Sequence, residues 1–411
     1  MKKIAVINQR YGAEVNGGSE YYTRLIAEHL KSYFDVTVLT TTAISYDTWK
    51  NEYPAGTDNV NGVRVLRFPV RRQRSMKIFR IVNKATFLLK KIHIHTDRMW
   101  VRAQGPETPQ LIAYIGQHAQ EYDVFIFVTY LYYTTVMGLP QVAVKSILIP
   151  TAHDEPYIHL PIYRPIFRNA AGIIYLTEEE KEFVHQTFEN AYLPHNVIGI
   201  GIDLPEQFRR PHTIKKAEEA FRAKYHIRGD YVIYAGRVDL GKNGKEMFTF
   251  FQTYKRRHPD SSLQLVIVGK AVMQIPKRAD IHYLGYVSEE DKYAAIAAAK
   301  WLWLPSRFES LSIALLEGMA LGTPGFVNGE CEVLKGHCIR SGGGVYYCGY
   351  EDFEQKMDEI SGYEDARYQR MCRKAEEYVE RNYQWDGVVE KLWQMIEGVR
   401  ECFGGYCLER L

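Results

Sequence analysis

Two glutamates in the second half of the chain have a spacing that limits the chemistry they can share. Glu309 and Glu317 lie eight residues apart in FESLSIALLEGMA (308–320), after a predicted strand. A helical span of that length measures roughly 12 Å, whereas the paired carboxylates of glycosidases lie about 5–9.5 Å apart. We therefore expect a ligand with a sugar-like group at each end and an anionic centre, which the helix-start amides between the two glutamates would hold. The alternative is a helix with an acidic first turn and one surface glutamate.

Two basic side chains follow another predicted strand. Arg237 and Lys242 lie in GRVDLGKN (236–243), directly after YVIYA (231–235). Ligands bind at the carboxyl ends of strands in doubly wound sheets, so both side chains can reach a bound anion there. Arginine grips a phosphate with two parallel bonds, and lysine supplies a compact charge. The alternative is two solvated surface cations, and the position after a buried strand favours the binding role.

Two motifs in the first half follow strands in the same way. Gly17 and Gly18 open a predicted helix after KIAVIN (3–8), where free amide groups attract phosphate. The alternative there is an ordinary glycine-containing loop. His153 follows KSILIP (145–150), where it can orient a substrate hydroxyl or stabilise developing charge. The alternative for His153 is a structural histidine.

No pattern in the sequence indicates a metal centre. D-x-D is absent, the cysteines lack zinc spacing, and His93 and His95 lie in a basic, apolar segment where we favour a non-ligating role. We therefore expect no metal site. The sequence also lacks G-x-S-x-G and Walker A motifs, which argues against an α/β hydrolase and a P-loop nucleotide hydrolase.

The elements that must position these residues alternate between strand and helix in two runs. The 411 residues are too many for one ordinary core, and DLPEQFRRPHT (203–213), with two prolines and no periodicity, separates the runs. Continuous Val/Ile/Leu strands between helices indicate parallel sheets covered on both faces. We predict an α/β chain of two doubly wound domains, 1–205 and 206–385, that face each other across a cleft. Strands are expected at 3–8, 35–41, 63–68, 123–128, 145–150, 172–176, 197–201, 231–235, 263–268, 301–304 and 325–328.

Charge is unevenly distributed, although the net charge is only +3. Between residues 61 and 104, twelve Lys and Arg accompany one acid, Asp97, which leaves −8 for the rest of the chain. The segment 71–102 is predicted to be largely helical and mixes these cations with apolar residues. One interpretation is a helix lying on an anionic membrane surface, and the other is a solvated basic helix with a core face. We hold the two as equal.

In order along the chain, these motifs resemble the retaining glycosyltransferases of the GT-B fold, family 4 (glycosyl transferases group 1). The resemblance rests on the Gly-Gly-x-Glu helix start, the Gly-Arg…Lys loop and the Glu-x₇-Glu segment with Gly-Thr-Pro (322–324) after it. It spans nearly the whole chain and is strongest in 231–328. It implies two Rossmann-like domains facing across a cleft, with the acceptor side in the first and the nucleotide sugar in the second. It also implies that a C-terminal helix, 386–411, packs back toward the first domain.

The resemblance further implies roles for single residues. His153 would lie near the reacting sugar, Glu309 would bond the donor sugar, and Glu317 would bond the ribose. Ser312 departs from the family pattern, in which a glycine stands near the phosphate path. The implied catalytic residues are His153, Glu309, Arg237 and Lys242, and the implied donor-binding residues are Gly17, Gly18, Arg237, Lys242, Glu309, Ser312, Ile313 and Glu317.

The activity that the resemblance implies is transfer of a sugar, with retention, from a UDP- or GDP-sugar to a glycan or lipid-linked glycan in cell-surface polysaccharide biosynthesis. Two cations and a helix start can stabilise the leaving diphosphate, so we expect metal-independent activity and no cofactor. The alternatives are a sugar phosphorylase, a sugar-nucleotide epimerase or a non-catalytic nucleotide-sugar-binding protein. We expect a cytoplasmic protein, with 71–102 as a peripheral contact to the inner face of the cytoplasmic membrane, and no nucleic-acid partner.

Overall fold

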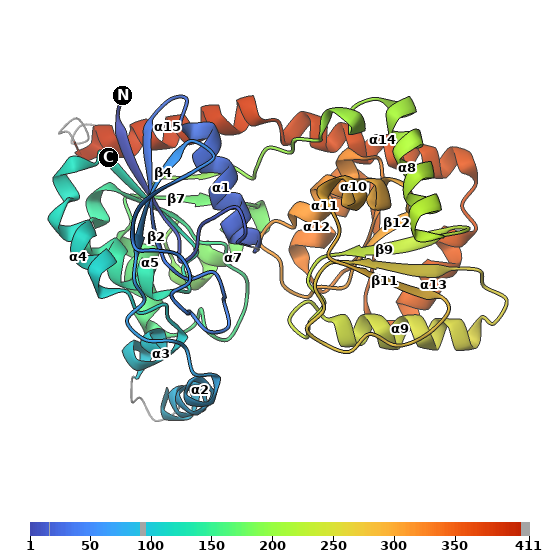
Figure 1. The fold of residues 1–411 in the computed structure, drawn as a ribbon, viewed down its shortest axis with the longest axis horizontal. Helices are drawn as coiled ribbons and strands as arrows, with labels where there is room; N and C mark the ends of the chain where they lie inside the picture. The colour runs from blue at the N-terminus through green and yellow to red at the C-terminus, as the bar shows by residue number, and fades with distance from the viewer. Residues whose placement is uncertain (16, 91–95, 404–411) are drawn as a thin grey trace. The chain divides into compact units, whose positions relative to one another are not determined.

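The computed structural model describes residues 1–15, 17–90 and 96–403. The chain divides into two compact units (Figure 1). Unit 1 is Met1–Ile200 together with Asp386–Leu411, and unit 2 is Gly201–Trp385. The predicted boundaries follow residues 205 and 385, and the contacts within the chain divide it after residues 200 and 385.

Unit 1 contains an eight-stranded sheet in the order β3-β4-β2-β1-β5-β6-β7-β8. Its strands are parallel except that β3 pairs with β4 in the antiparallel direction. The central strands carry buried apolar runs, as a sheet covered on both faces requires. Helices α1 (Gly18–Leu30) and α4 (Pro109–Gln117) lie on opposite sides of this sheet in Figure 1. The strands are β1 (Lys3–Ile7), β2 (Asp35–Thr41), β3 (Gly56–Val60), β4 (Val63–Phe68), β5 (Val124–Val128), β6 (Ser146–Ile149), β7 (Gly172–Tyr175) and β8 (His195–Val197).

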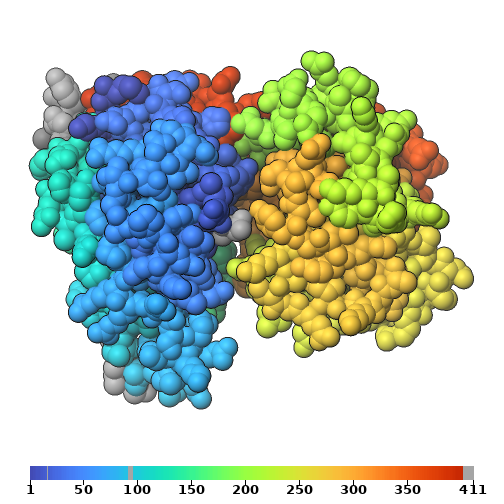
Figure 2. Space-filling view, viewed as in Figure 1, coloured from blue at the N-terminus to red at the C-terminus, as the bar shows by residue number. Residues whose placement is uncertain are grey.

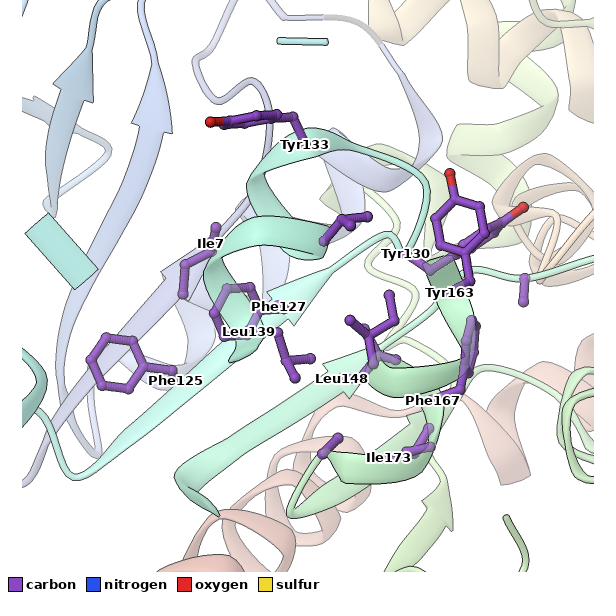
Figure 3. Packing of buried hydrophobic residues seen from close by; sticks show 14 of the residues in the cluster. Ile7, Phe125, Phe127, Tyr130, Tyr133, Leu139, Leu148, Tyr163, Phe167 and Ile173 are labelled. Atoms are coloured by element: carbon purple, nitrogen blue, oxygen red, sulfur yellow. The ribbon is translucent and has the colours of Figure 1, made fainter. Parts of the chain in front are cut away.

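The core of unit 1 is rich in aromatic side chains. Phe127 on β5 and Leu148 on β6 are fully buried and belong to one cluster with Leu139, which follows helix α5 (Tyr133–Gly138) (Figure 3). Burying each large apolar side chain contributes about 1.5–3 kcal/mol, so this cluster fixes the strands whose ends carry the loops described below. Two further helices of the unit are α6 (Arg164–Asn169) and α7 (Glu178–Phe188).

The basic segment of unit 1 forms two helices. Helix α2 (Met76–Lys90) buries only Phe79 and Thr86, and helix α3 (Asp97–Gln104) packs against it. Figure 1 shows both at one end of the unit, beyond the strands. Among the described residues, no helix combines the length and the apolar character needed to cross a membrane.

Unit 2 contains a six-stranded sheet in the order β11-β10-β9-β12-β13-β14, and every neighbouring pair of these strands is parallel. The order reverses direction between β9 and β12, which makes this pair the switch point of a doubly wound sheet. The strands are β9 (Tyr231–Ala235), β10 (Gln264–Val268), β11 (Ile281–Gly285), β12 (Trp301–Leu304), β13 (Gly325–Asn328) and β14 (Gly344–Tyr347). The helices are α8 (Pro211–Tyr225), α9 (Gly244–Arg257), α10 (Glu289–Ala297), α11 (Ile313–Ala320), α12 (Glu332–Ser341), α13 (Gly349–Ser361) and α14 (Asp365–Asn382).

The predicted α/β architecture with two doubly wound units is confirmed, and one predicted strand is wrong. The segment 197–201 was expected to be a strand, but β8 is His195–Val197 and the chain runs on without regular structure. Beyond Val197, the last residue of β8, Ile198 and Ile200 are buried at 2% and 0% exposed without belonging to a strand. Their hydrophobicity therefore reflects burial rather than strand pairing.

The last helix, α15 (Trp385–Phe403), packs within unit 1. Lys2, just before β1, forms an ion pair with Glu397 of this helix. Gly172 at the start of β7 lets the helix approach closely, because a Cβ there would lie 3.1 Å from side-chain atoms of both Met395 and Val399. The two ends of the chain are thus joined across the unit.

Candidate functional site

In unit 2, two loops meet at one edge of the sheet. One follows β9 and contains Arg237 and Lys242, and the other follows β12 and contains Glu309. Because β9 and β12 are parallel neighbours, their carboxyl ends lie side by side. The loops are joined directly by an ion pair, with Lys242 Nζ donating to Glu309 Oε1 at 2.7 Å. The structure therefore brings these three predicted residues to the same place.

Asp239, which the sequence reasoning did not identify, organises the first loop. Its carboxylate pairs with Arg237 Nε and accepts a hydrogen bond from the Lys242 backbone N–H at 2.8 Å. Tyr234 on β9 adds a hydrogen bond from its hydroxyl to the Arg237 carbonyl at 2.7 Å. Carboxylates thus hold both cations, Arg237 and Lys242, at this edge of the sheet.

The second loop ends in a turn that begins helix α11. Ser312 is the N-cap residue and has a φ of 66°, in the left-handed region that favours glycine. Its carbonyl accepts the backbone N–H of Leu315 at 3.0 Å, which starts the helix. The predicted amide donors near Ser312 and Ile313 accordingly lie at the helix N-terminus, where the helix dipole favours an anion.

His337 on α12 supports this turn from behind and was also missed. Its Nε2–H donates to the Leu311 carbonyl at 2.9 Å, and its Nδ1 accepts from the Tyr378 hydroxyl of α14 at 3.0 Å. Burial lowers the pKa of His337 to about 3, so the ring is neutral. No spacing in the sequence marks His337, because its partners lie 26 and 41 residues away.

Glu317 lies one turn further into α11 and is held by helix α10. Its Oε1 accepts hydrogen bonds from Lys292 Nζ at 3.1 Å and from the Tyr293 hydroxyl at 2.9 Å. Burial alone would lower the pKa of Lys292, but the carboxylates of Glu317 and Glu289 outweigh it and the pKa is raised. Lys292 therefore stays charged beside the Glu317 carboxylate.

The other predicted residues belong to unit 1. Gly17 is the N-cap of α1, and Gly18 is its first residue. The carboxylate of Glu20 lies against this helix start, since a Cβ at position 17 would be 2.1 Å from Glu20 Oε2. Glu20 is buried and pairs with Arg10 at 2.6 Å. The sequence does not show that the Glu20 side chain fills the space beside Gly17. Asn16, of the same motif, lies outside the described residues.

His153 lies in the loop after β6. Its Nε2 is 3.6 Å from Glu155 Oε2, and Glu155 Oε1 accepts the Tyr130 hydroxyl at 2.6 Å. The loop is anchored by Glu180, whose Oε1 accepts the Ala152 backbone N–H at 2.5 Å. Burial raises the pKa of Glu180 to about 8, against the opposing effect of its two backbone donors.

The described side chains were also compared with the ligand sets that metal ions need. Within the described residues, no group of three or more His, Cys, Asp or Glu is arranged to hold an ion. His93 and His95 lie outside the described residues.

Comparisons with known proteins show which family model and which folds this chain resembles. Residues 217–360 match the family model of glycosyl transferases group 1, and this stretch contains all six predicted residues of unit 2. The structure of sucrose-phosphate synthase from Thermosynechococcus elongatus has a TM-score of 0.68 at 16% identity, covering 98% of this chain and 100% of that one. A structure of Anabaena Alr3699/HepE in complex with UDP-glucose has a TM-score of 0.68 at 13% identity, covering 97% and 100%. The chain has the GT-B fold.

One curated protein is similar in sequence over part of its length. Mannosylfructose-phosphate synthase from Agrobacterium fabrum (strain C58) is 23% identical over 203 residues, which is 44% of this chain. The match spans 43% of the length of that protein. Residues 217–360 thus match a known family model, and nearly the whole chain has the fold of solved structures.

Proposed function

We propose that this protein is a retaining glycosyltransferase that uses a UDP- or GDP-sugar as donor and a glycan or lipid-linked glycan as acceptor. The observation that carries the proposal is the edge of the unit 2 sheet where Arg237, Lys242 and Glu309 meet the N-terminus of α11. It lies within the stretch matched by the family model, and a solved structure of the same fold was obtained with UDP-glucose.

The proposed donor chemistry follows from the partners of each side chain. The diphosphate would lie at the amides of Ser312 and Ile313 and draw Lys242 away from Glu309, which leaves the Glu309 carboxylate for a sugar hydroxyl. Lys242 and Glu309 are 36% and 14% exposed, so both can meet a ligand. Glu317 would bond the ribose. The two cations then stabilise the negative charge that grows on the leaving diphosphate.

The transfer is proposed to proceed on one face of the sugar, with the departing phosphate oxygen taking the proton of the acceptor. Arg237 and Lys242 supply the charge that a metal would otherwise provide, so we propose that activity is metal-independent. From unit 1, His153 is proposed to contact the reacting sugar. Gly18, where an added Cβ would meet no atom within 4 Å, is proposed to allow close approach of the donor to the backbone. Gly17 is proposed to do the same once the Glu20 carboxylate moves away from the helix start.

The acceptor side is proposed to include an anionic membrane surface. On α2, Ile78, Ile81 and Leu88 share one helix face and are 60%, 70% and 61% exposed. Lys77 and Arg80 lie beside this stripe and are exposed as well. A basic helix with an exposed apolar face matches the charge and depth of an anionic lipid interface. This arrangement would bring lipid-linked acceptors of cell-surface polysaccharide synthesis to the enzyme at the cytoplasmic membrane.

The test is product analysis with a panel of nucleotide sugars, which reports the sugar transferred and its anomeric configuration. Arg237→Ala should lower turnover about 100–1,000-fold, the usual loss for a donor to developing negative charge. Arg256→Ala, an exposed cation on α9 of the same unit, is the matched control and should leave turnover unchanged. Near-normal turnover of Arg237→Ala, or transfer to free phosphate instead of a glycan, would refute the proposal.

A further inference from the structure

Unit 1 contains a cavity whose lining residues have no role in the proposed donor binding. This cavity, of about 440 Å³, lies between the loop after β4 and helices α2 and α3. This volume is within the range of about 300–1,000 Å³ typical of small-molecule sites. Four arginines line it, namely Arg71, Arg72, Arg74 and Arg102.

The positive charge of this cavity is not balanced by the protein. The one acidic residue in its lining is Glu107. Glu107 Oε1 lies 3.8 Å from Arg71 and 3.9 Å from Arg102, beyond hydrogen-bond distance from either guanidinium. Among the described residues, Arg72 has no hydrogen-bond or ion-pair partner. Four cations thus share a single carboxylate, and like charges held together favour an anion between them.

One of the arginines is fixed in place before any ligand binds. Arg74 Nη2 donates to the Gln104 side chain at 2.6 Å, and its guanidinium lies 4.3 Å from the ring centre of Phe79 and 5.4 Å from that of Tyr46. A guanidinium fixed in this way loses little entropy when it forms a bidentate bond to phosphate.

The rest of the lining is apolar and partly open to solvent. Trp49 in the lining is buried, whereas Ile78 and Met99 are each 60% exposed. Ile78 also belongs to the exposed apolar face of α2, so the wall of the cavity continues into that face. The cavity therefore offers a charged part for a phosphate and an apolar part that continues onto the helix surface.

We propose that this cavity binds a phosphate group carried on an aliphatic chain. The guanidinium group of Arg74 would hold the phosphate together with those of Arg72 and Arg102. Ile78 and Met99 would contact the first part of the chain. That this ligand is the anionic end of the acceptor rests on the proposed glycosyltransferase function. The binding of the ligand itself does not depend on that function.

The test is calorimetric binding of four probes to the full chain: decyl phosphate below its micelle concentration, inorganic phosphate, glucose 6-phosphate and decanol. Decyl phosphate should bind at least about tenfold more tightly than each of the others, because only it fills both parts of the cavity. Inorganic phosphate or glucose 6-phosphate binding as tightly as decyl phosphate would overturn the apolar half of the proposal. Equal binding of decanol would overturn the charged half.

Matched variants locate the site. Arg72→Gln and Arg102→Gln should each weaken decyl phosphate binding about tenfold, whereas Arg98→Gln, an exposed cation on the same helix α3 but outside the cavity, should not. Equal losses in all three variants would indicate general electrostatics and overturn the site. UDP binding, measured in the same samples, tests the donor site separately. GDP binding is measured alongside it. If neither UDP nor GDP binds while decyl phosphate behaves as expected, the proposed function fails and the cavity stands.

Discussion

The stability of unit 2 should fall in mild acid because of one buried histidine. His337 is fully buried, donates to the Leu311 carbonyl and accepts from the Tyr378 hydroxyl. Burial, together with the nearby Arg340 cation, lowers its pKa to about 3. A proton on Nδ1 would also remove the acceptor for Tyr378. The folded unit therefore excludes a proton that the unfolded chain readily takes up.

The size of the effect follows from the two pKa values. Histidine in an unfolded chain has a pKa of about 6.5. The contribution of His337 to stability is thus fully present above pH 6.5 and is lost as the pH falls toward 3. Linkage gives a loss of about 2 kcal/mol in the free energy of unfolding between pH 7.5 and pH 5.

Replacement of the ring isolates this contribution. Gln at position 337 can keep one donor and one acceptor but takes up no proton. We expect the loss of stability between pH 7.5 and pH 5 to be about 2 kcal/mol smaller in His337→Gln than in the wild type. His212→Gln, at an exposed site on α8, should retain the wild-type loss.

The assay is urea-dependent hydrogen exchange, read on peptides of α11 and α12 and corrected for the intrinsic exchange rate at each pH. Peptide-level detection is needed because two units need not unfold together. An unchanged pH dependence in His337→Gln would refute the assignment of this stability to His337.

Three further predictions concern the turn, the metal requirement and the membrane. Ser312→Gly should stabilise unit 2 by about 1 kcal/mol, because a φ of 66° strains any residue with a Cβ; a lower urea midpoint would contradict this. Treatment with EDTA should leave turnover unchanged, and loss of activity that Mg²⁺ restores would show a metal requirement. In a flotation assay, the wild-type protein should bind vesicles that contain anionic lipid, and the double variant Ile81→Glu, Leu88→Glu should not bind them. Wild-type binding that does not depend on anionic lipid would contradict the proposed membrane contact.

The central strands could be predicted from the sequence because each is a continuous apolar run. The segments 231–235, 301–304 and 325–328 match β9, β12 and β13 residue for residue. Edge strands were missed for the opposite reason. Strand β3 has the sequence GTDNV and is largely exposed, so no buried pattern marks it.

In the candidate site, the sequence likewise indicates single residues but not the contacts between them. Glu309 and Lys242 could be identified one at a time, since each follows a buried strand. Their ion pair depends on β9 and β12 being neighbours, which the sequence does not state. Lys292 and His337 were missed because their contacts to Glu317 and Leu311 join separate helices and loops with no fixed spacing.

The phosphate contact predicted at the start of α1 in unit 1 is the part of the site that the sequence alone determines least. The sequence predicts a phosphate contact at Gly17 and Gly18, because glycines at a helix start leave room for phosphate. The structure places the carboxylate of Glu20 there, held by Arg10. A side chain three residues into a helix can fold back over its start, and only the structure shows that it does.

The central claim is that the edge of unit 2 formed by the loops after β9 and β12 binds a nucleotide diphosphate sugar. A crystal structure of the protein with UDP-glucose tests it most directly. We predict the diphosphate between Arg237, Lys242 and the start of α11, with the ribose at Glu317. UDP-glucose bound at any other place, with these side chains still paired to Asp239, Glu309 and Lys292, would contradict it.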